Sequence, residues 1–205
     1  MMTNLLNAKL IIKPISDKIF LVDNLLNEHV IGYLRLRMEF TNTFDDYYKD
    51  YQATNYLPGK DFVTDTLEKE MSTKFKLNNF QRAWSFIYNN FSNGVQFHAD
   101  PSNINVNIWL TPEESIEDYS KNGLLICNKK PPKNWSREQW NGNKDGCINK
   151  FLQEEKAEII KINYRYNRGI FFDGALFHKT DSVKTKNEIL NRRVSYTMLF
   201  GNTLE

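Results

Sequence analysis

The stretch Gln96-Phe97-His98-Ala99-Asp100-Pro101 decides how the rest of the chain is interpreted. It holds a histidine and an aspartate separated by one residue. Side chains alternate between the two faces of a strand, so on a strand His98 and Asp100 would point to the same side. An imidazole and a carboxylate that converge on one point supply two of the three ligands of a facial metal site. The pair alone is a weak signal, because His-x-Asp often arises by chance.

A distal histidine and an arginine strengthen the metal interpretation. The chain has only three histidines, and His178 follows another short apolar run. Two histidines and one carboxylate form the facial triad that binds non-haem Fe(II) and leaves coordination positions open. Arg193 comes later on a strand pattern, with Ser195 two residues beyond it. We therefore predict an iron site at His98, Asp100 and His178, with a 2-oxoglutarate pocket beside it.

Composition favours a single domain that spans residues 1–205 and buries a substantial core. The 14 Phe, 10 Tyr and 4 Trp suit β structure and aromatic-lined pockets, and the net charge of +2 does not call for a nucleic acid or an anionic membrane. No apolar run approaches the roughly 18 residues of a membrane helix. Without an export signal, Cys127 and Cys147 are expected to be free thiols and the location cytoplasmic.

Residues 1–79 are predicted to form a support region of helices and strands. The segment Thr41–Lys60 is polar and rich in tyrosine, so it is either a substrate-contacting loop or, as we favour, an irregular surface connection. His29 belongs to no spaced cluster and is expected at the surface or packed. The predicted elements are the strands Lys9–Ile15 and Lys18–Val22, a helix over Leu25–Phe40 capped by Asp23 or Asn24, and a helix over Phe62–Phe75.

Residues 80–205 change to a strand period and are predicted to form the catalytic core. In Ile104–Leu110 the alternation places Asn105, Asn107 and Trp109 on one face. Buried amides without partners are costly, so this face meets either solvent or a polar pocket, and the adjacent metal pair favours the pocket. Tyr88, on the strand Gln81–Phe91, either points its hydroxyl into that pocket or is a buried tyrosine with a backbone partner.

An insertion around residues 128–157 interrupts the predicted core. Asn128–Gly146 combines basic residues with Trp135 and Trp140 and shows no core pattern. It is either a lid that contacts substrate or a solvated loop whose tryptophans pack onto the body, and we slightly favour the loop. A short helix is expected over Ile148–Lys156.

The final strand pattern, residues 192–200, places Arg193, Ser195 and Thr197 on one face and Arg192 on the other. A guanidinium and a hydroxyl on one inward face could hold a carboxylate in two-point geometry. The strands Leu124–Cys127, Glu158–Tyr166 and Ile170–Phe172 are predicted to complete the core.

These motifs resemble the Fe(II)/2-oxoglutarate-dependent dioxygenases, through His98-Ala99-Asp100, His178 and Arg193-Val194-Ser195. The resemblance covers roughly Tyr88 to Gly201. It is closer to a group of bacterial oxygenase domains that are sometimes joined to tetratricopeptide repeats, although this sequence contains no repeats. It implies a mainly β (α+β) fold, with a double-stranded β-helix (a cupin-like jelly roll) as core and flanking N-terminal helices.

The resemblance also implies roles for individual residues. His98, Asp100 and His178 would bind Fe(II), and Arg193 with Ser195 would hold the distal carboxylate of 2-oxoglutarate. The gap between His178 and Arg193 is longer than is common in the family, which leaves Arg192 as a fallback. The remaining candidates are Tyr88, Asn107 and Trp109 beside the cosubstrate, with Trp109 replacing a tyrosine of some members, and Asn105, Trp135 and Trp140 for substrate.

The implied reaction consumes O2 and 2-oxoglutarate and releases succinate and CO2. Halogenating relatives lack the carboxylate ligand, so Asp100 indicates hydroxylation. The substrate is a small molecule, an amino-acid derivative or a protein side chain, and neither a nucleic-acid nor a membrane partner is expected. Oligomeric state stays open. Two alternatives remain, namely a cupin-type metal enzyme that does not use 2-oxoglutarate and a catalytically degenerate binding module.

Overall fold

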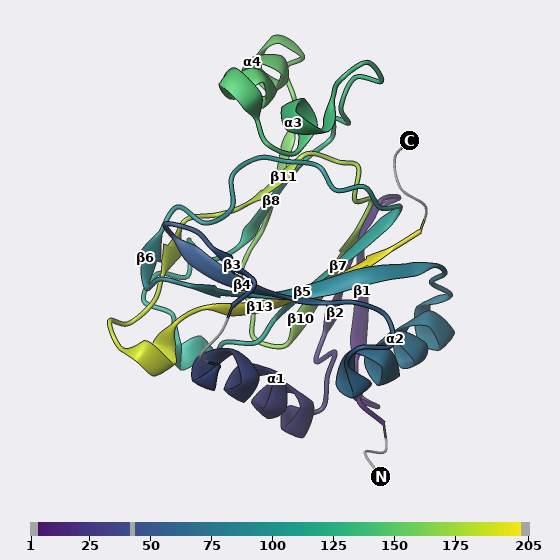
Figure 1. Cartoon of the computed structure of the whole chain (residues 1–205), viewed down its shortest axis with the longest axis vertical. Coiled ribbons are helices and arrows are strands. Elements are labelled where there is room, and N and C mark those ends of the chain that lie inside the picture. Colours follow the sequence, from purple (N-terminus) through teal and green to yellow (C-terminus); the bar gives the residue numbers. More distant parts are fainter. Residues whose placement is uncertain (1–3, 42–43, 202–205) are drawn as a thin grey trace.

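The computed structural model describes residues 4–41 and 44–201 of the chain. Its main layer is an eight-stranded sheet in which every neighbouring pair is antiparallel (Figure 1). The strands, in spatial order, are β1 (Ile11–Ser16), β2 (Ile19–Asp23), β10 (Arg168–Phe172), β7 (Ile104–Trp109), β13 (Val194–Phe200), β5 (Phe80–Tyr88), β4 (Tyr51–Tyr56) and β3 (Asp46–Tyr47).

A smaller sheet faces the inner side of this layer. It consists of β11 (His178–Thr180), β8 (Leu124–Cys127) and β9 (Ile159–Ile162), and a short pair, β6 (Phe91–Ser92) with β12 (Val183–Lys184), lies nearby. Apolar residues of both sheets, including Trp109, Ile126 and Phe172, form one buried cluster. The two-layered antiparallel arrangement confirms the predicted double-stranded β-helix core.

Two helices, α1 (Glu28–Phe40) and α2 (Phe62–Phe75), cover the outer face of the large sheet (Figure 1). They bury Val30, Leu34, Leu67 and Met71 against the sheet, because these residues recur at helical spacing along one side of each helix. Asp61 caps α2 by accepting a hydrogen bond from the Thr64 amide at 2.8 Å.

Several predicted boundaries required correction. The cap of α1 is Asn27 rather than Asp23 or Asn24. The Tyr-rich segment 41–60 was expected to be irregular, but it forms the β3–β4 hairpin at the sheet edge, apart from residues 42–43, which lie outside the described residues. The expected helix over Ile148–Lys156 is α4 (Cys147–Glu154). The segment 128–146 also contains a short helix, α3 (Arg137–Trp140). Short 3-10 helices elsewhere in the described chain and at the end of this segment span Glu113–Ser115, Ile189–Asn191 and Lys144–Gly146.

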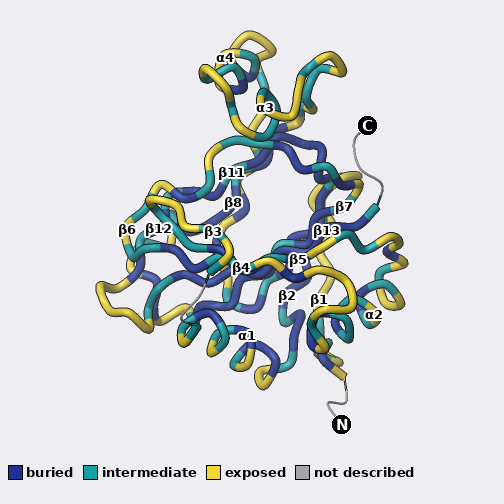
Figure 2. The backbone as a smooth tube through the Cα atoms, in the orientation of Figure 1, coloured by how far each residue is buried: buried dark blue, intermediate teal, exposed yellow. Residues whose placement is uncertain are grey.

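The tube in Figure 2 is mostly buried through β7 and β13, whereas the insertion with α3 and α4 projects from the body and is largely exposed. No helix in the described ranges is both long and apolar enough to span a membrane.

Cys127 and Cys147 are free, as expected, and burial raises the pKa of the Cys127 thiol to about 11. The division into a support region and a core stays a prediction.

Asp23 is not a helix cap but the centre of a buried charge cluster at the end of β2. Its fully buried carboxylate pairs with Arg168 Nε at 2.6 Å, Lys13 Nζ at 2.7 Å and Arg165 Nη1 at 3.2 Å. Burial alone would raise the pKa of Asp23, but these cations outweigh it and lower the pKa to about 2. The cluster therefore ties the edge strand β1 and the β10 end to β2.

We expect Asp23→Asn to lower the free energy of unfolding by roughly 2 kcal/mol at pH 7, because it removes charge-assisted hydrogen bonds and leaves Arg168 without its counter-ion. A depressed carboxylate pKa stabilises the fold at neutral pH, and that contribution is lost as the pH falls from about 4 towards 2. Urea unfolding at several pH values, with the exposed Asp17→Asn as control, measures both effects. A difference from wild type that stays constant down to pH 3 would contradict this assignment.

Candidate active site

The inner face of the large sheet presents the predicted pocket residues in cross-strand rows. Ser195 on β13 lies opposite Trp109 on β7 and Phe86 on β5, and Thr197 lies opposite Asn107 in the next row of the same face. Because β7, β13 and β5 are neighbours in one antiparallel sheet, side chains at matching register point the same way. The strand register therefore places the predicted polar residues of β7 and β13 side by side on the inner face of the sheet.

The three proposed metal ligands meet at the end of the small sheet. His98 Nε2 lies 3.8 Å from Asp100 Oδ1, and His178 Nε2 lies 3.4 Å from Asp100 Oδ2. One ligand atom from each residue falls within 4.8 Å of the others. The His98 segment is not the strand that was predicted: it forms a single antiparallel bridge with His178, through reciprocal backbone hydrogen bonds of 3.0 and 2.9 Å. That bridge places both imidazoles beside Asp100.

Both histidines are in the tautomer that a metal ligand requires. His98 Nδ1 lies 2.7 Å from the Gln96 carbonyl oxygen, and His178 Nδ1 lies 2.8 Å from the Leu176 carbonyl oxygen. A carbonyl can only accept, so each Nδ1 carries the proton and each Nε2 is left with a free lone pair. Burial and the neighbouring His178 lower the pKa of His98 to about 4, which keeps its ring neutral at pH 7.

Asp100 is held by a buried polar network. Burial alone would raise its pKa, but the neighbouring His178 and His98 and the hydrogen bond from Asn105 lower it, so the carboxylate is ionised. Asn105 Nδ2 donates to Asp100 Oδ2 at 2.6 Å, and the Asn105 carbonyl oxygen accepts from the Ser102 hydroxyl. A Cβ on Gly174 would come within 2.1 Å of Ser102 Oγ. Glycine is therefore required for the close approach.

Asn105 was predicted to contact substrate, but it does not line the cleft that leads to His98 and Asp100. The side chain is completely buried, lies behind Asp100 and uses both its amide groups within the chain. This position suits Asn105 to orient the Asp100 carboxylate, a proposed metal ligand, rather than to contact a bound substrate. Ser102, its partner, was not singled out from the sequence, because a serine after a proline carries no distinctive pattern.

The interior of the fold also holds a buried cation that has no acidic partner among the described residues. Arg193 is 1% exposed, and among the described residues it belongs to no ion pair. Its guanidinium carbon lies 4.8, 5.6 and 5.9 Å from the ring centres of Tyr88, Trp109 and Tyr164. A buried charge is costly unless it is paired, so this environment calls for an anion from outside the chain.

Unsatisfied polar atoms cluster around the same cation. Within the described ranges, Arg193 Nε and Nη1, Trp109 Nε1, Ser195 Oγ and Asn107 Oδ1 are buried and have no hydrogen-bond partner. Buried polar groups are nearly always paired in folded proteins, so a group of orphans on adjacent rows marks a place for a polar ligand. Arg192, by contrast, is half-exposed and bonds to the Ile189 carbonyl.

Tyr88 is buried, as the second predicted alternative requires, but its hydroxyl meets a side chain rather than a backbone group. It is buried, with its hydroxyl 3.3 Å from Thr180 Oγ1, and its ring lies against the Arg193 guanidinium. It thus lines the space between β5 and the small sheet. Thr180 was not anticipated from the sequence, because it lies in the charged stretch after His178.

A cleft of about 1050 Å³ leads from the surface to His98 and Asp100. Its floor is formed by inward residues of β4 and β5, and aromatic rings follow one another along it: Tyr48 and Tyr51 stack at 4.5 Å, and Tyr51 meets Phe86 edge-on at 5.5 Å. The segment expected to be a simple surface connection therefore lines the cleft through the β3–β4 hairpin.

The insertion forms the opposite wall and also clamps the metal-binding segment. Trp140 lines the cleft and its carbonyl accepts a 2.8 Å hydrogen bond from the Ala99 amide, while Asn141 Nδ2 donates to the Ala99 carbonyl. Trp135 does not line the cleft and packs on Phe151 and Phe177 instead. The two predicted substrate residues of this segment thus separate, one in the wall and one in the support.

Solved structures with the same architecture come from iron- and 2-oxoglutarate-dependent enzymes. HygX from Streptomyces hygroscopicus, with nickel and 2-oxoglutarate bound, is 11% identical at a TM-score of 0.62 over 91% of this chain and 83% of its own. The epimerase SnoN, in complex with Fe3+, alpha ketoglutarate and nogalamycin RO, is 12% identical at a TM-score of 0.65 over 91% of this chain and 79% of its own.

A prolyl hydroxylase from Trichoplax adhaerens, in complex with a hypoxia-inducible factor peptide, is 10% identical at a TM-score of 0.55 over 90% of this chain and 84% of its own. No family model matches the chain, and no curated protein matches it. At these identities the comparisons show the fold, which is the double-stranded β-helix of the 2-oxoglutarate oxygenases. The closer resemblance to domains joined to tetratricopeptide repeats stays a prediction.

We expect His178→Ala to abolish tight binding of Fe(II) or Mn(II) while the fold survives, because removal of one facial ligand leaves two. Anaerobic calorimetric titration with either metal measures this, and His98→Ala and Asp100→Ala should behave alike. The matched control is His29→Ala, since His29 is the remaining histidine and lies exposed on α1. Unchanged metal affinity in His178→Ala would refute the assignment.

Proposed function

We propose that the protein is an Fe(II)- and 2-oxoglutarate-dependent dioxygenase that hydroxylates its substrate. The observation that carries this proposal is the buried Arg193 guanidinium, which has no acidic partner in the described chain and is surrounded by orphaned polar atoms beside a His-Asp-His triad. The side chains match both the metal and the cosubstrate: two imidazoles and a carboxylate suit the metal, and a planar guanidinium with a hydroxyl suits a carboxylate.

In this proposal His98, Asp100 and His178 hold Fe(II), and Asn105 keeps the Asp100 carboxylate oriented through their 2.6 Å hydrogen bond. Arg193 and Ser195 hold the distal carboxylate of 2-oxoglutarate. Bound Fe(II), with 2-oxoglutarate and O2, supplies the oxidising chemistry that releases succinate and CO2 and inserts oxygen into the substrate. The buried aromatic surroundings of Arg193 exclude water, which strengthens the charge interaction.

Tyr88, Trp109 and Asn107 complete the cosubstrate pocket in this proposal. Among the described residues, Trp109 Nε1 is a donor without a partner, and Asn107 donates to Thr197 Oγ1 at 2.7 Å but leaves its own side-chain oxygen unpaired. A donor is suited to a carboxylate oxygen, whereas a lone carbonyl acceptor needs a bound water or a hydroxyl. Trp109 thus supports Arg193 more directly than Asn107 does.

The two alternatives account for less of the structure. A cupin-type metal enzyme that does not use 2-oxoglutarate leaves the Arg193 charge, which has no ion pair among the described residues, without explanation. A degenerate binding module leaves the intact triad without explanation, including the Nδ1 hydrogen bonds that fix both histidine tautomers. Succinate formation that depends on 2-oxoglutarate would exclude both.

We further propose that the substrate is larger than a free amino acid. The cleft volume of about 1050 Å³ reaches the upper range of small-molecule sites, and aromatic rings line both walls. HygX has been solved with hygromycin B and the Trichoplax enzyme with a peptide, so the fold accommodates extended substrates. Trp140, rather than Trp135, is the residue of the insertion suited to contact it. We keep a cytoplasmic location as part of the proposal, consistent with the free thiols.

We expect Arg193→Lys to weaken 2-oxoglutarate binding by about tenfold or more, because an ammonium cannot make the two-point contact of a guanidinium and each 1.4 kcal/mol is a factor of ten. Arg193→Ala should weaken it further. Ser195→Ala removes only a neighbouring hydroxyl and should weaken 2-oxoglutarate binding a few-fold. Calorimetric titration of the Mn(II)-loaded protein with 2-oxoglutarate gives these affinities directly.

The matched control is Arg192→Ala, because Arg192 precedes the anchor and turns its side chain to the Ile189 carbonyl. It should leave 2-oxoglutarate affinity nearly unchanged, and Mn(II) affinity should be the same in all four variants. A large loss in Arg192→Ala together with a small one in Arg193→Ala would overturn the identity of the anchor. Failure of the wild-type protein to bind 2-oxoglutarate would overturn the proposed function.

A further inference from the structure

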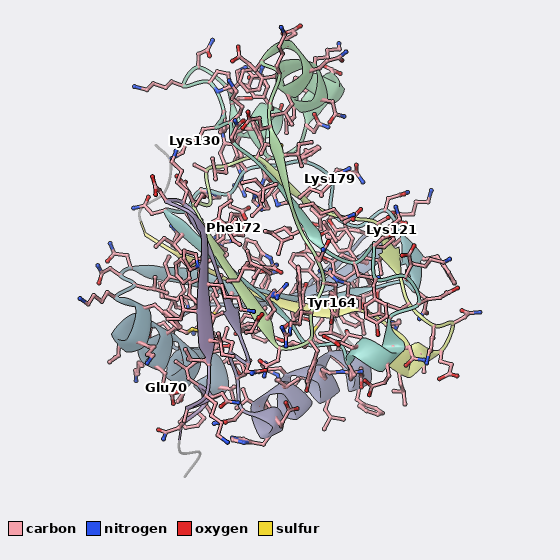
Figure 3. All side chains as sticks on the ribbon, turned by 180° about the vertical axis from the view of Figure 1, so that it is seen from behind. Glu70, Lys121, Lys130, Tyr164, Phe172 and Lys179 are labelled. Carbon is pink, nitrogen blue, oxygen red and sulfur yellow. The ribbon has the colours of Figure 1, made fainter. Side chains whose placement is uncertain are left out.

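We propose that Thr111 and Tyr164 are positioning residues for the cosubstrate, which hold the Arg193 guanidinium in place before 2-oxoglutarate arrives. This inference rests on the proposed function and deepens it. Neither residue has a motif that points to a role. Both are buried, Thr111 at the exit of β7 and Tyr164 beyond β9; Figure 3 labels Tyr164 in the interior.

Thr111 binds the backbone on both sides of the anchor. Its hydroxyl accepts a 2.7 Å hydrogen bond from the Val194 amide and donates to the Arg192 carbonyl at 3.2 Å. The Arg193 carbonyl itself accepts from the Tyr88 amide at 2.9 Å. One hydroxyl thus fixes the residues before and after Arg193, at the point where the chain enters β13 and sheet pairing has just begun.

Tyr164 links this backbone clamp to the aromatic cage. Its hydroxyl donates to the Thr111 carbonyl, and its ring stacks on Trp109 at 5.0 Å with an interplanar angle of 17°. Both rings face the Arg193 guanidinium, and Tyr88 is the third ring around it. Aromatic faces attract a desolvated guanidinium without neutralising it. The cation therefore stays available to a carboxylate.

The arrangement resolves a physical difficulty of the site. An acidic neighbour would hold Arg193 in place but would compete with the ligand carboxylate for the same donors. A long side chain left free would lose rotamer entropy on binding, which weakens affinity. Rings and backbone hydrogen bonds preorganise the guanidinium without occupying its donors. Loss of Thr111 or Tyr164 should therefore weaken recognition of the distal carboxylate in particular.

The test compares two ligands of the Mn(II)-loaded protein by calorimetry. 2-Oxoglutarate has a distal carboxylate, whereas 2-oxobutanoate keeps the 2-oxo acid group and lacks it. Thr111→Val preserves shape and removes both hydroxyl hydrogen bonds. We expect it to weaken 2-oxoglutarate binding by about five- to tenfold, the equivalent of about one hydrogen bond, with no change for 2-oxobutanoate or Mn(II).

Two further comparisons separate positioning from folding. Thr111→Ser retains the hydroxyl and should restore the preference for 2-oxoglutarate. Tyr164→Phe keeps the stacked ring and should have a smaller effect than Tyr164→Leu, which removes it. The matched control is Tyr166→Phe, because Tyr166 follows closely in the chain but its hydroxyl bonds to Glu28 outside the pocket.

The outcomes are distinct. Selective loss of 2-oxoglutarate affinity in Thr111→Val and Tyr164→Leu, with rescue in Thr111→Ser, supports the inference. An equal loss for both oxo acids and for Mn(II) would mean a merely structural role and would overturn it, as would unchanged affinities. If the wild-type protein binds neither oxo acid, the proposed function itself fails.

Discussion

The candidate site depends on two backbone hydrogen bonds between His98 and His178, which join segments far apart in the sequence. The reciprocal pairing fixes both residues as an antiparallel bridge, so their side chains emerge together and meet Asp100. The same segments carry the carbonyls that orient each imidazole. Ligand spacing, tautomer and closure of the small sheet are therefore consequences of one local pairing, which no single segment could provide alone.

A second constraint is the cost of burying charge without a partner. The two buried charges, Asp23 and Arg193, have different surroundings. Asp23 is neutralised by Arg168, Lys13 and Arg165, and its pKa falls accordingly. Arg193 is surrounded by aromatic rings and has no ion pair in the described chain. The first arrangement stabilises the fold, and in the proposed function the second keeps a charge free for the cosubstrate.

The sequence predicted those features that depend on alternation within a strand. Trp109 and Arg193 are buried, as the alternation of side chains along β7 and into β13 predicts. What it could not predict depends on contacts across the fold. Asn105 was assigned to substrate, yet Ser102 and Asp100 take up its amide; Thr111 and Tyr164 were overlooked, because their significance comes from residues they meet in space.

In the proposed function, the insertion couples substrate contact to the position of the metal ligands. Its Trp140 side chain lines the cleft, while its backbone carbonyl accepts from Ala99, the residue between two proposed metal ligands. Side chains of this segment can therefore change to suit a substrate, but its backbone path cannot change without moving His98 and Asp100. The insertion is thus a wall fastened to the metal-binding segment rather than a free lid. A deletion within 128–146 should impair metal binding as well as substrate contact, whereas a substitution at the exposed Arg137 should affect substrate contact alone.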